Sequence, residues 1–319
     1  MIVIFTGGTG GAKFVDGMRQ IVPEEDIAVI VNTADDLEWW GLYVSPDVDS
    51  ITYILSGLLS EERGWGVKGE TFFCLQTMKK LGQPSWFNVG DRDLALHLTR
   101  TKLMHEGKTL SEATAQISAE LGIRSQILPM TNTHVETRVD TPIGELSFQE
   151  YFVKRWFQDP VNSVRFAGIE NASPAPGVID CIMSASAILF APSNPITSIG
   201  PILAVPGIRS ALKNTPACIA AISPIIGDAP VSGPAGILMS AHGFPVTIAG
   251  VAKAYEDFLD VLIVDHADQA AAAELRKSGL RVHCTSTIMK TLKDRTELAR
   301  ITLAAANADT SAASGGAPS

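Results

Sequence analysis

A glycine-rich loop directly after a short apolar run constrains the fold of this chain more than any other feature. Ile2–Phe5 is uniformly apolar and leads into Thr6-Gly-Gly-Thr-Gly-Gly-Ala-Lys13, after which apolar residues recur at helical spacing. A second apolar run, Ala28–Val31, follows that helical stretch. This order predicts a β-α-β unit whose two strands are parallel and are joined by a right-handed crossover.

The rest of the chain extends this pattern. A long polar loop is expected from Thr33 to Asp49, and helices are expected at roughly Asp49–Leu59, Thr71–Leu81, Asp91–His105 and Ser111–Leu121. Asp140-Thr-Pro-Ile-Gly144 indicates a hairpin, within a segment from about Ile127 to Phe166 that we interpret as part of an inserted α+β subdomain. Apolar runs typical of parallel strands return at Ala187–Phe190, Ala217–Ile222 and Val261–Val264. Arg281–Cys284 is expected as a last strand and Leu292–Ala306 as a closing helix.

The 319 residues therefore predict one large α/β domain over residues 1–307. Its core is expected from residues 1–60 and 160–307, with a helical and hairpin insertion at about 60–160. The tail, residues 308–319, is rich in Ser, Gly, Ala and Pro and is predicted to be disordered.

Composition excludes several classes of protein. Hydrophobic residues make up 46 % of the chain, too many for a disordered protein, and the formal net charge of -9 argues against binding polymeric nucleic acid. The longest charge-free stretch, Cys181–Ile208, is broken by prolines, so no membrane span is expected. The four cysteines are far apart and form no Cys-x-x-Cys pair, which predicts a reducing, cytoplasmic location.

The glycine loop has the character of a phosphate site. Glycines let the backbone approach a ligand, and the start of the following helix offers free N–H groups and a positive dipole end. The loop lacks the third glycine of the dinucleotide fingerprint and is not a Walker A loop, so the prediction is a diphosphate site of a different type. The alternative is a tight turn that serves helix packing alone. Lys13 is either a phosphate ligand or a solvated lysine.

Carboxylates gather after the second predicted strand. Asp35 and Asp36 fall where a ligand crevice is expected, and Ser45-Pro-Asp-Val-Asp49 places two more carboxylates at a helix start. With a diphosphate nearby, Mg²⁺ is the natural bridge between such groups. The alternative is helix capping by Ser45 or Asp47, with Asp49 favouring the helix dipole.

A second acidic turn, Asn88-Val-Gly-Asp-Arg-Asp93, enters another predicted helix. Asp91 is a plausible cap, and Arg92 is either a surface partner of the aspartates or a ligand clamp. His97 and Arg100 lie one turn apart on that helix, and His97 is expected to be packed.

Two loops in the second half complete the pattern. Pro192-Ser-Asn-Pro-Ile-Thr-Ser-Ile-Gly-Pro201 and Ile226–Ala235 each follow a predicted strand and carry Ser, Asn, Thr, Asp and Gly. Loops at the carboxyl ends of three parallel strands thus carry polar groups, as a crevice site requires. Motifs for zinc chemistry and serine hydrolysis are absent from the sequence. A nucleotide-type α/β enzyme or binding protein using Mg²⁺ is what these patterns support.

Several motifs together resemble the 2-phospho-L-lactate transferase family of coenzyme F420 biosynthesis. They run from about residue 2 to residue 270 and include the loop Thr6–Lys13, Val31-Asn-Thr-Ala-Asp-Asp36, Gly41–Asp49, Gly64-Trp-Gly66, Gly90–Ala95, Leu128-Pro-Met130, Pro192–Ile202, Ser223–Gly227 and Gly233-Pro-Ala235. The family loop usually has Thr-Pro where this chain has Gly11-Ala12, and Trp39-Trp40 is bulkier than expected beside the acceptor site.

The resemblance implies a fold and an activity. The fold would be a Rossmann-like parallel sheet with helices on both faces plus an inserted α+β subdomain. The enzyme would transfer a phosphorylated C3 acid from a guanosine-diphosphate-linked donor to the ribityl hydroxyl of the deazaflavin Fo, with GMP leaving. The acid would be 2-phospho-L-lactate or its enolpyruvyl or glyceryl counterpart. Mg²⁺ would be required, and homodimers would be usual.

The resemblance also implies site residues. The guanosine diphosphate of the donor would be held by Gly7, Gly8, Thr9, Gly10, Lys13, Ser193, Asn194 and Pro195. Asp49, Asn88 and Arg92 would bind Fo, Asp49 would also be the catalytic residue, and Asp47 and Asp49 would be the metal ligands. Two alternatives remain: a protein of the same superfamily that binds nucleotide sugars as a regulator without catalysis, and a nicotinamide dehydrogenase with a degenerate fingerprint.

Overall fold

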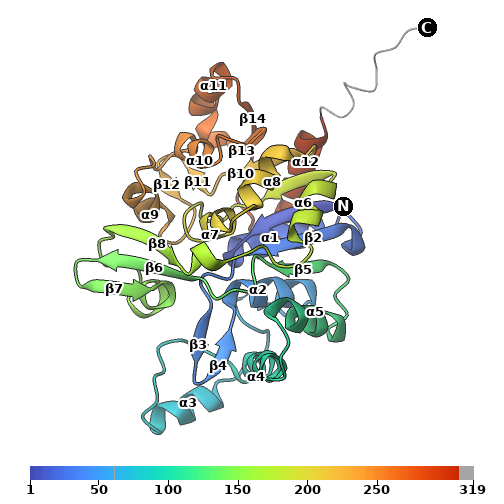
Figure 1. Cartoon of the computed structure of the whole chain (residues 1–319). Helices are drawn as coiled ribbons and strands as arrows, with labels where there is room; N and C mark the ends of the chain where they lie inside the picture. Colours follow the sequence, from blue (N-terminus) through green and yellow to red (C-terminus); the bar gives the residue numbers. More distant parts are fainter. Residues whose placement is uncertain (61, 309–319) are drawn as a thin grey trace.

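The chain folds around a seven-stranded parallel sheet (Figure 1). A computed structural model describes residues 1–60 and 62–308, so nearly all of the predicted tail, 308–319, lies outside the described residues. From edge to edge the strands are β14 (Arg281–Thr285), β13 (Val261–Asp265), β10 (Cys218–Ile222), β9 (Ala187–Phe190), β1 (Ile2–Thr6), β2 (Ile27–Val31) and β5 (Gln126–Pro129). Every neighbouring pair is parallel, which confirms the predicted α/β class.

Helices cover both faces because the strands are apolar on both sides. In β1, Ile2 and Ile4 point into one core while Val3 and Phe5 point into the other. The first core is covered by α1 (Gly8–Met18), α2 (Pro46–Leu55) and α12 (Leu292–Asn307). The second is covered by α6 (Val178–Ser184), α7 (Gly200–Ala204), α8 (Ile208–Asn214), α9 (Ala235–Ala241), α10 (Ile248–Ala254) and α11 (Gln269–Lys277).

The direction of the chain across the sheet changes between β1 and β9. From β1 the chain moves outward through β2 to β5, whereas from β9 it moves the other way through β10, β13 and β14. Phe5 of β1 therefore lies between Ile30 and Phe190, on strands far apart in sequence. Such a switch point opens a crevice at the carboxyl ends of the strands, where open α/β sheets bind ligands.

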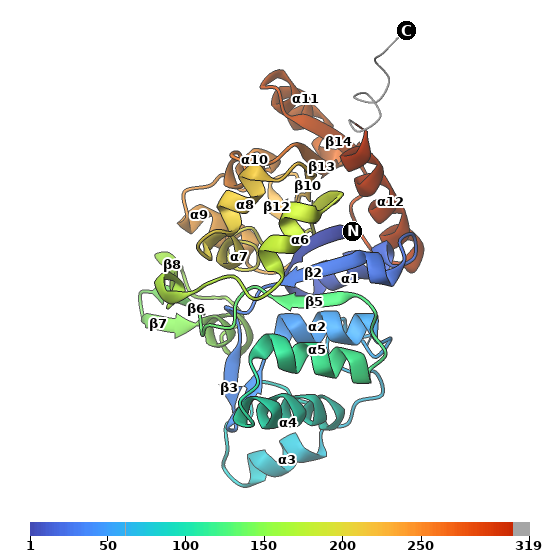
Figure 2. The ribbon, with the colours of Figure 1, turned by 45° about the vertical axis from the view of Figure 1, so that its right-hand side comes forward.

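Two additions extend the sheet. Figure 2 shows α2, α5 (Leu110–Glu120), α4 (Asp91–His105) and α3 (Phe73–Lys80) one below another under β5. A three-stranded antiparallel sheet has the order β7 (Gly144–Ser147), β6 (Glu136–Thr141), β8 (Ser163–Ala167), and the predicted hairpin is its β6–β7 pair. β5, however, lies inside the segment expected to be inserted, yet it forms the edge of the main sheet. Its four residues, Gln126–Pro129, are too few for a clear strand pattern.

The loop expected from Thr33 to Asp49 contains a hairpin that the prediction missed. β3 (Leu37–Trp39) and β4 (Leu42–Val44) pair through a two-residue turn, Trp40-Gly41, in which both residues have positive φ. Hairpin turns of this kind usually carry Asn-Gly, so tryptophan in the first position hid the signal. Trp40 donates its indole N–H to the Pro84 carbonyl at 2.9 Å. The hairpin is held by an aromatic cluster, which comprises Trp39, Trp40, Trp86 and Phe87.

Within the described residues, no helix has both the length and the apolar character that crossing a bilayer would require.

The packing of α12 on α1 leads to the first prediction. A Cβ at Gly17 would lie 2.2 Å from the Arg295 carbonyl oxygen, so Gly17→Ala must push two helices apart. We expect a loss of about 1–3 kcal/mol in the free energy of unfolding, measured by urea denaturation. Gly236→Ala on α9 is the matched control, because its new methyl group meets the movable side chain of Val246 at 3.2 Å. Equal stability of the two variants would contradict this account of the contact.

Candidate active site

The glycine loop and the loop after β9 are bonded to each other across the switch point. Ser193 donates its hydroxyl to the Gly7 carbonyl at 2.8 Å and accepts from the Gly7 N–H at 3.3 Å. Its oxygen also lies 3.4 Å from the Thr6 hydroxyl. Two segments that are separated by more than 180 residues are thus joined at the centre of the crevice.

The glycines of this loop have two different roles. A Cβ at Gly11 would lie 1.5 Å from Thr6 Oγ1, and one at Gly7 would lie 2.6 Å from Asp47 Oδ2, so both glycines permit close packing. Gly8 differs, because its φ is +72° and no described atom outside its immediate chain neighbours lies within 4 Å of its Cβ position. Packing therefore explains Gly7 and Gly11, whereas Gly8 borders open space at the amino end of α1.

Asp47 caps this helix from another part of the chain. Its Oδ1 accepts the Gly8 N–H at 2.7 Å, and its Oδ2 accepts the Asn32 amide at 3.0 Å. Ser45 occupies the N-cap position of α2, but neither its side chain nor that of Asp47 makes a capping bond to this helix. Ser45 instead donates to Asp36 at 2.7 Å. The carboxylates after β2 and at the start of α2 are therefore turned toward the glycine loop and toward each other.

Three buried carboxylates form one acidic group at this point. Burial raises the pKa of Asp35 well above its usual range, and the charge of Asp47 raises it further. Burial likewise raises the pKa of Asp47 to about 6, although the bonds from Asn32 and Gly8 oppose the change. Burial raises the pKa of Asp36 well above normal, against hydrogen bonds from Ser45 and Tyr43. Holding these groups ionised in the free protein is therefore costly.

The donors around this acidic group are too few for its oxygens. The Asn32 amide nitrogen has two hydrogens but lies within 3.2 Å of three acceptors, which are Asp35 Oδ2, Asp47 Oδ2 and the Thr197 carbonyl. Asp35 Oδ1 has no well-formed hydrogen bond among the described residues, although the Thr137 hydroxyl lies beside it and lowers its pKa in part. A surplus of carboxylate oxygens beside a phosphate-type loop fits a hard divalent cation.

Asp49 lies in a different environment from Asp47. It pairs with Arg100 of α4, and its Oδ2 lies 3.6 Å from His97 Nδ1. His97 Nε2 lies 3.3 Å from Asp93, which accepts the Tyr53 hydroxyl. Burial raises the pKa of Asp49, and Arg100 and His97 oppose that rise. Arg100 was not predicted as a site residue, since one-turn spacing from His97 was its only sequence signal.

The ligand atoms of Asp49, Asp93 and His97 lie within 4.8 Å of one another, close enough to surround a metal ion. The guanidinium of Arg100, bonded to Asp49, opposes a second cation there. On electrostatic grounds a cation is expected to prefer the Asp35–Asp47 group, which would make Asp49 the weaker of the two metal ligands predicted from the sequence.

The other predicted residues lie around these groups. Asn194 accepts the Ile196 N–H at 2.9 Å and shapes the loop that also contains Pro195. Thr9 is exposed and Lys13 half-buried on α1.

The acidic turn before α4 also bonds neighbouring segments of the chain. Asn88 and Arg92 are exposed, and Arg92 Nη1 donates to the Lys68 carbonyl at 3.1 Å. Asp91 caps α3 rather than its own helix, accepting from the Phe73 and Cys74 N–H groups.

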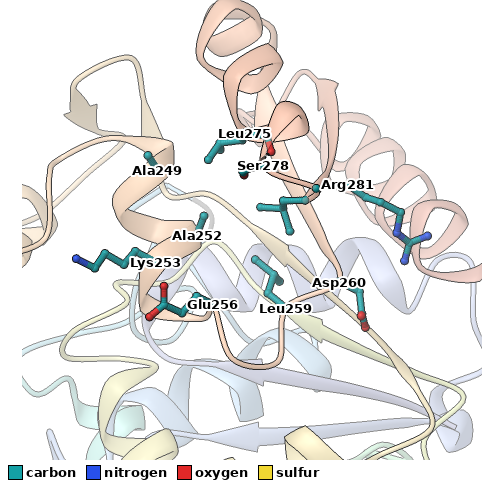
Figure 3. Close-up of a pocket in the computed structure, with 11 residues that line it drawn as sticks. Ala249, Ala252, Lys253, Glu256, Leu259, Asp260, Leu275, Ser278 and Arg281 are labelled. Carbon is teal, nitrogen blue, oxygen red and sulfur yellow. Dashed lines mark hydrogen bonds between the residues drawn. The ribbon is translucent and has the colours of Figure 1, made fainter.

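A pocket of about 720 Å³ lies elsewhere (Figure 3). Its walls include Lys253 of α10, Glu256 and Asp260 from the segment between α10 and β13, and Arg281 at the amino end of β14. None of the residues predicted from the sequence lines it. Since ligands of open α/β sheets bind at the carboxyl ends of the strands, the candidate site is the region beside the glycine loop.

Known proteins resemble this chain over nearly its whole length. The family model of the 2-phospho-L-lactate transferase CofD matches residues 2–310. A 2-phospho-L-lactate transferase of Methanosarcina mazei is 40 % identical over 304 residues, which cover 95 % of this chain and 100 % of the relative. The transferase of the same name from Methanococcoides burtonii is 42 % identical and covers 94 % and 97 %. A phosphoenolpyruvate transferase of Streptomyces coelicolor is also 42 % identical, covering 94 % and 96 %.

One solved structure supports the fold alone. It is a UPF0052-family protein from Bacillus halodurans, which matches with a TM-score of 0.64 at 17 % identity and covers 95 % of this chain and 98 % of that one. Together these matches define the chain as an enzyme of the transferase class. It belongs to the 2-phospho-L-lactate transferase family, CofD, as its motifs predicted.

Asp47 and Asp49 should respond oppositely to loss of charge. Because the folded-state pKa of Asp47 is raised from 3.8 to about 6, its ionisation lowers stability as pH rises from about 4 to 6. In EDTA at pH 7 we expect Asp47→Asn to stabilise the protein by about 1–3 kcal/mol, with the gain vanishing below about pH 4.

Asp49→Asn should instead destabilise by about 3–5 kcal/mol, because it leaves the Arg100 guanidinium buried without a counter-ion, and this cost exceeds the burial cost that raises the pKa of Asp49. Thermal unfolding from about pH 3 to pH 8 measures the stability of both variants. If both substitutions changed the stability in the same direction at pH 7, the opposite electrostatic roles of the two aspartates would be contradicted.

Proposed function

We propose that this enzyme transfers a phosphorylated C3 acid from a guanosine-diphosphate-linked donor to the deazaflavin Fo, releasing GMP, as a step of coenzyme F420 biosynthesis. Membership of the family supports this proposal. The observation that carries it in the structure is the contact between the glycine loop and the acidic group, in which Asp47 bonds Gly8 at 2.7 Å. A loop suited to binding phosphate thus lies next to carboxylates suited to binding a cation. This combination suits a transfer reaction at a diphosphate.

The donor's diphosphate lies at the amino end of α1. Gly8 borders open space there, and the N–H groups of Thr9 and Gly10 belong to the first turn of the helix, where anions are favoured, while the Gly8 N–H bonds Asp47. Gly7, Ser193, Asn194 and Pro195 build the wall of this site, and Lys13 of the same helix supplies positive charge.

The acceptor lies on the side of Asp49, Asn88 and Arg92, where α2 and the start of α4 meet. Asp49 orients the ribityl hydroxyl by accepting its hydrogen bond. Asp47 and Asp35, whose carboxylates share the Asn32 amide, are the groups that would hold Mg²⁺, and Asp49 contributes charge nearby. When bound, the metal supplies charge neutralisation at the diphosphate.

The reaction is then a displacement at phosphorus. The acceptor oxygen forms a bond to the phosphorus next to the C3 acid, the bond from that phosphorus to the oxygen of GMP breaks, and the hydroxyl proton is lost to solvent or to Asp49. Such transfers depend on positioning and on charge stabilisation rather than on a covalent nucleophile. The chain contributes the fixed N–H groups of α1 and a rigid carboxylate on either side of the reacting atoms.

Product analysis tests this proposal. The purified protein is incubated with Fo, Mg²⁺ and an equimolar mixture of the lactyl, enolpyruvyl and glyceryl guanosine-diphosphate donors, followed by mass spectrometry. We expect one deazaflavin product together with stoichiometric GMP, and the product mass identifies the acid. Failure of all three donors, together with tight binding of a UDP-sugar, would instead support a regulatory binding protein.

The turnover of Asp49 and Asp47 variants distinguishes the acceptor side of the site from the metal side. Asp49→Asn should lower turnover at least tenfold, about 1.4 kcal/mol in activation free energy, because the acceptor loses its orienting group. Asp47→Asn should raise the Mg²⁺ concentration that gives half-maximal rate while changing the KM for Fo little. Near-normal turnover of Asp49→Asn would remove its proposed role.

Dimerisation and a cytoplasmic location remain predictions from the sequence. Light scattering of the purified protein tests the first.

A further inference from the structure

α4 contributes a buried cationic group that the sequence motifs do not explain. Arg100 is among the largest fully buried side chains of the protein, with 1 % exposure. Its guanidinium bonds both oxygens of Asp49 and lies 3.4 Å from the Tyr43 carbonyl of β4. Arginine is rarely buried so completely without a specific partner, because removing its charge from water is expensive.

His97 completes the enclosure of the same carboxylate. It lies one turn before Arg100 on α4 and is also 1 % exposed. Its ring stands between two carboxylates, with Nδ1 3.6 Å from Asp49 and Nε2 3.3 Å from Asp93. Both oxygens of Asp49 therefore face groups supplied by α4.

We propose that Arg100 and His97 are positioning residues for the acceptor, which hold the Asp49 carboxylate in one orientation and so set where the attacking hydroxyl binds. This inference rests on the proposed function in one respect, namely that Asp49 meets the acceptor. Neither residue touches the substrate; each acts through Asp49.

The shape of the Arg100 guanidinium explains why a lysine could not hold the Asp49 carboxylate equally well. The guanidinium fork engages two carboxylate oxygens in one plane, which fixes both the position and the rotation of the carboxylate. An ammonium group makes a point contact and leaves the rotation free. A misoriented hydroxyl costs rate steeply, because the reacting atoms must be aligned.

The same helix also connects Asp49 to the other acceptor residues. Arg92 lies in the first turn of α4 and Asn88 just before it, while His97 and Arg100 follow one and two turns further along. α4 therefore carries exposed acceptor residues at its start and the buried groups that hold Asp49 in its middle. The acceptor side of the crevice is expected to behave as one rigid unit.

The test measures acceptor and donor separately. Variants Arg100→Lys, Arg100→Met and His97→Gln are assayed for kcat, for KM of Fo and of the donor, and for equilibrium binding of Fo and of GDP. We expect Arg100→Met to lower kcat/KM for Fo at least tenfold, Arg100→Lys to give an intermediate loss, and GDP binding to stay within twofold of the wild type. His97→Gln should lower kcat/KM for Fo about threefold or more.

A matched control separates positioning from general destabilisation. Arg295 is 6 % exposed and pairs with Asp16 at 2.8 Å, so Arg295→Met also removes a buried arginine from an aspartate. We expect it to lower the melting temperature while leaving kcat/KM for Fo within twofold at 25 °C. If folded Arg100→Met or Arg100→Lys behaved like this control, the inference would be overturned.

A double-mutant cycle with Asp49 gives the decisive result. If Arg100 acts through Asp49, Asp49→Asn and the double variant Asp49→Asn/Arg100→Met should have the same kcat/KM for Fo within about threefold. Multiplicative losses would mean that Arg100 acts elsewhere. Should Arg100→Met fail to fold, Arg100→Lys and His97→Gln in the same cycle decide the question. Absence of any transferred product from the wild type would instead refute the proposed function.

Discussion

The bond between the glycine loop and Asp47 is the contact on which the crevice depends. It joins the amino end of α1 to the start of α2, and through Asn32 it reaches the loop after β2 and the Thr197 carbonyl. Ser193 ties the loop after β9 to the other side of the same glycines. This group of bonds fixes the polar side chains of these loops relative to one another, whereas buried Ala34, Ile196 and Ile199 anchor the loops in the core.

Charge is distributed unequally over the two sides of this contact. Around Asp47 and Asp35 the carboxylates outnumber their donors, which favours an external cation. Around Asp49 the protein supplies its own cation in Arg100. Two aspartates separated by a single residue on one helix therefore have opposite electrostatic requirements, because the first turn of α2 presents one to the glycine loop and the other to α4.

The sequence predicted those parts of the fold that depend on local pattern. β1, β9 and β13 stand out because buried parallel strands are continuous apolar runs, and α5 begins at a capping box formed by Thr109 and Glu112, which is a local sequence pattern. The hairpin of β3 and β4 was missed because Trp40 occupies a turn position that normally takes asparagine. The site was predicted through its loops, whereas Arg100 and His97 were not, since their roles arise from a helix packing across sequence distance.

The packing of α12 on α1 affects how the protein folds during synthesis. The helix that follows the glycine loop is covered by the last helix described, and β1 has β9 as a neighbour. Neither surface exists until more than half of the chain has left the ribosome, and contacts so distant in sequence form slowly. The newly synthesised amino-terminal segment thus exposes apolar strands until β9 and α12 have been synthesised. Expression at low temperature or with chaperones should therefore matter more for this enzyme than for a protein built from local contacts.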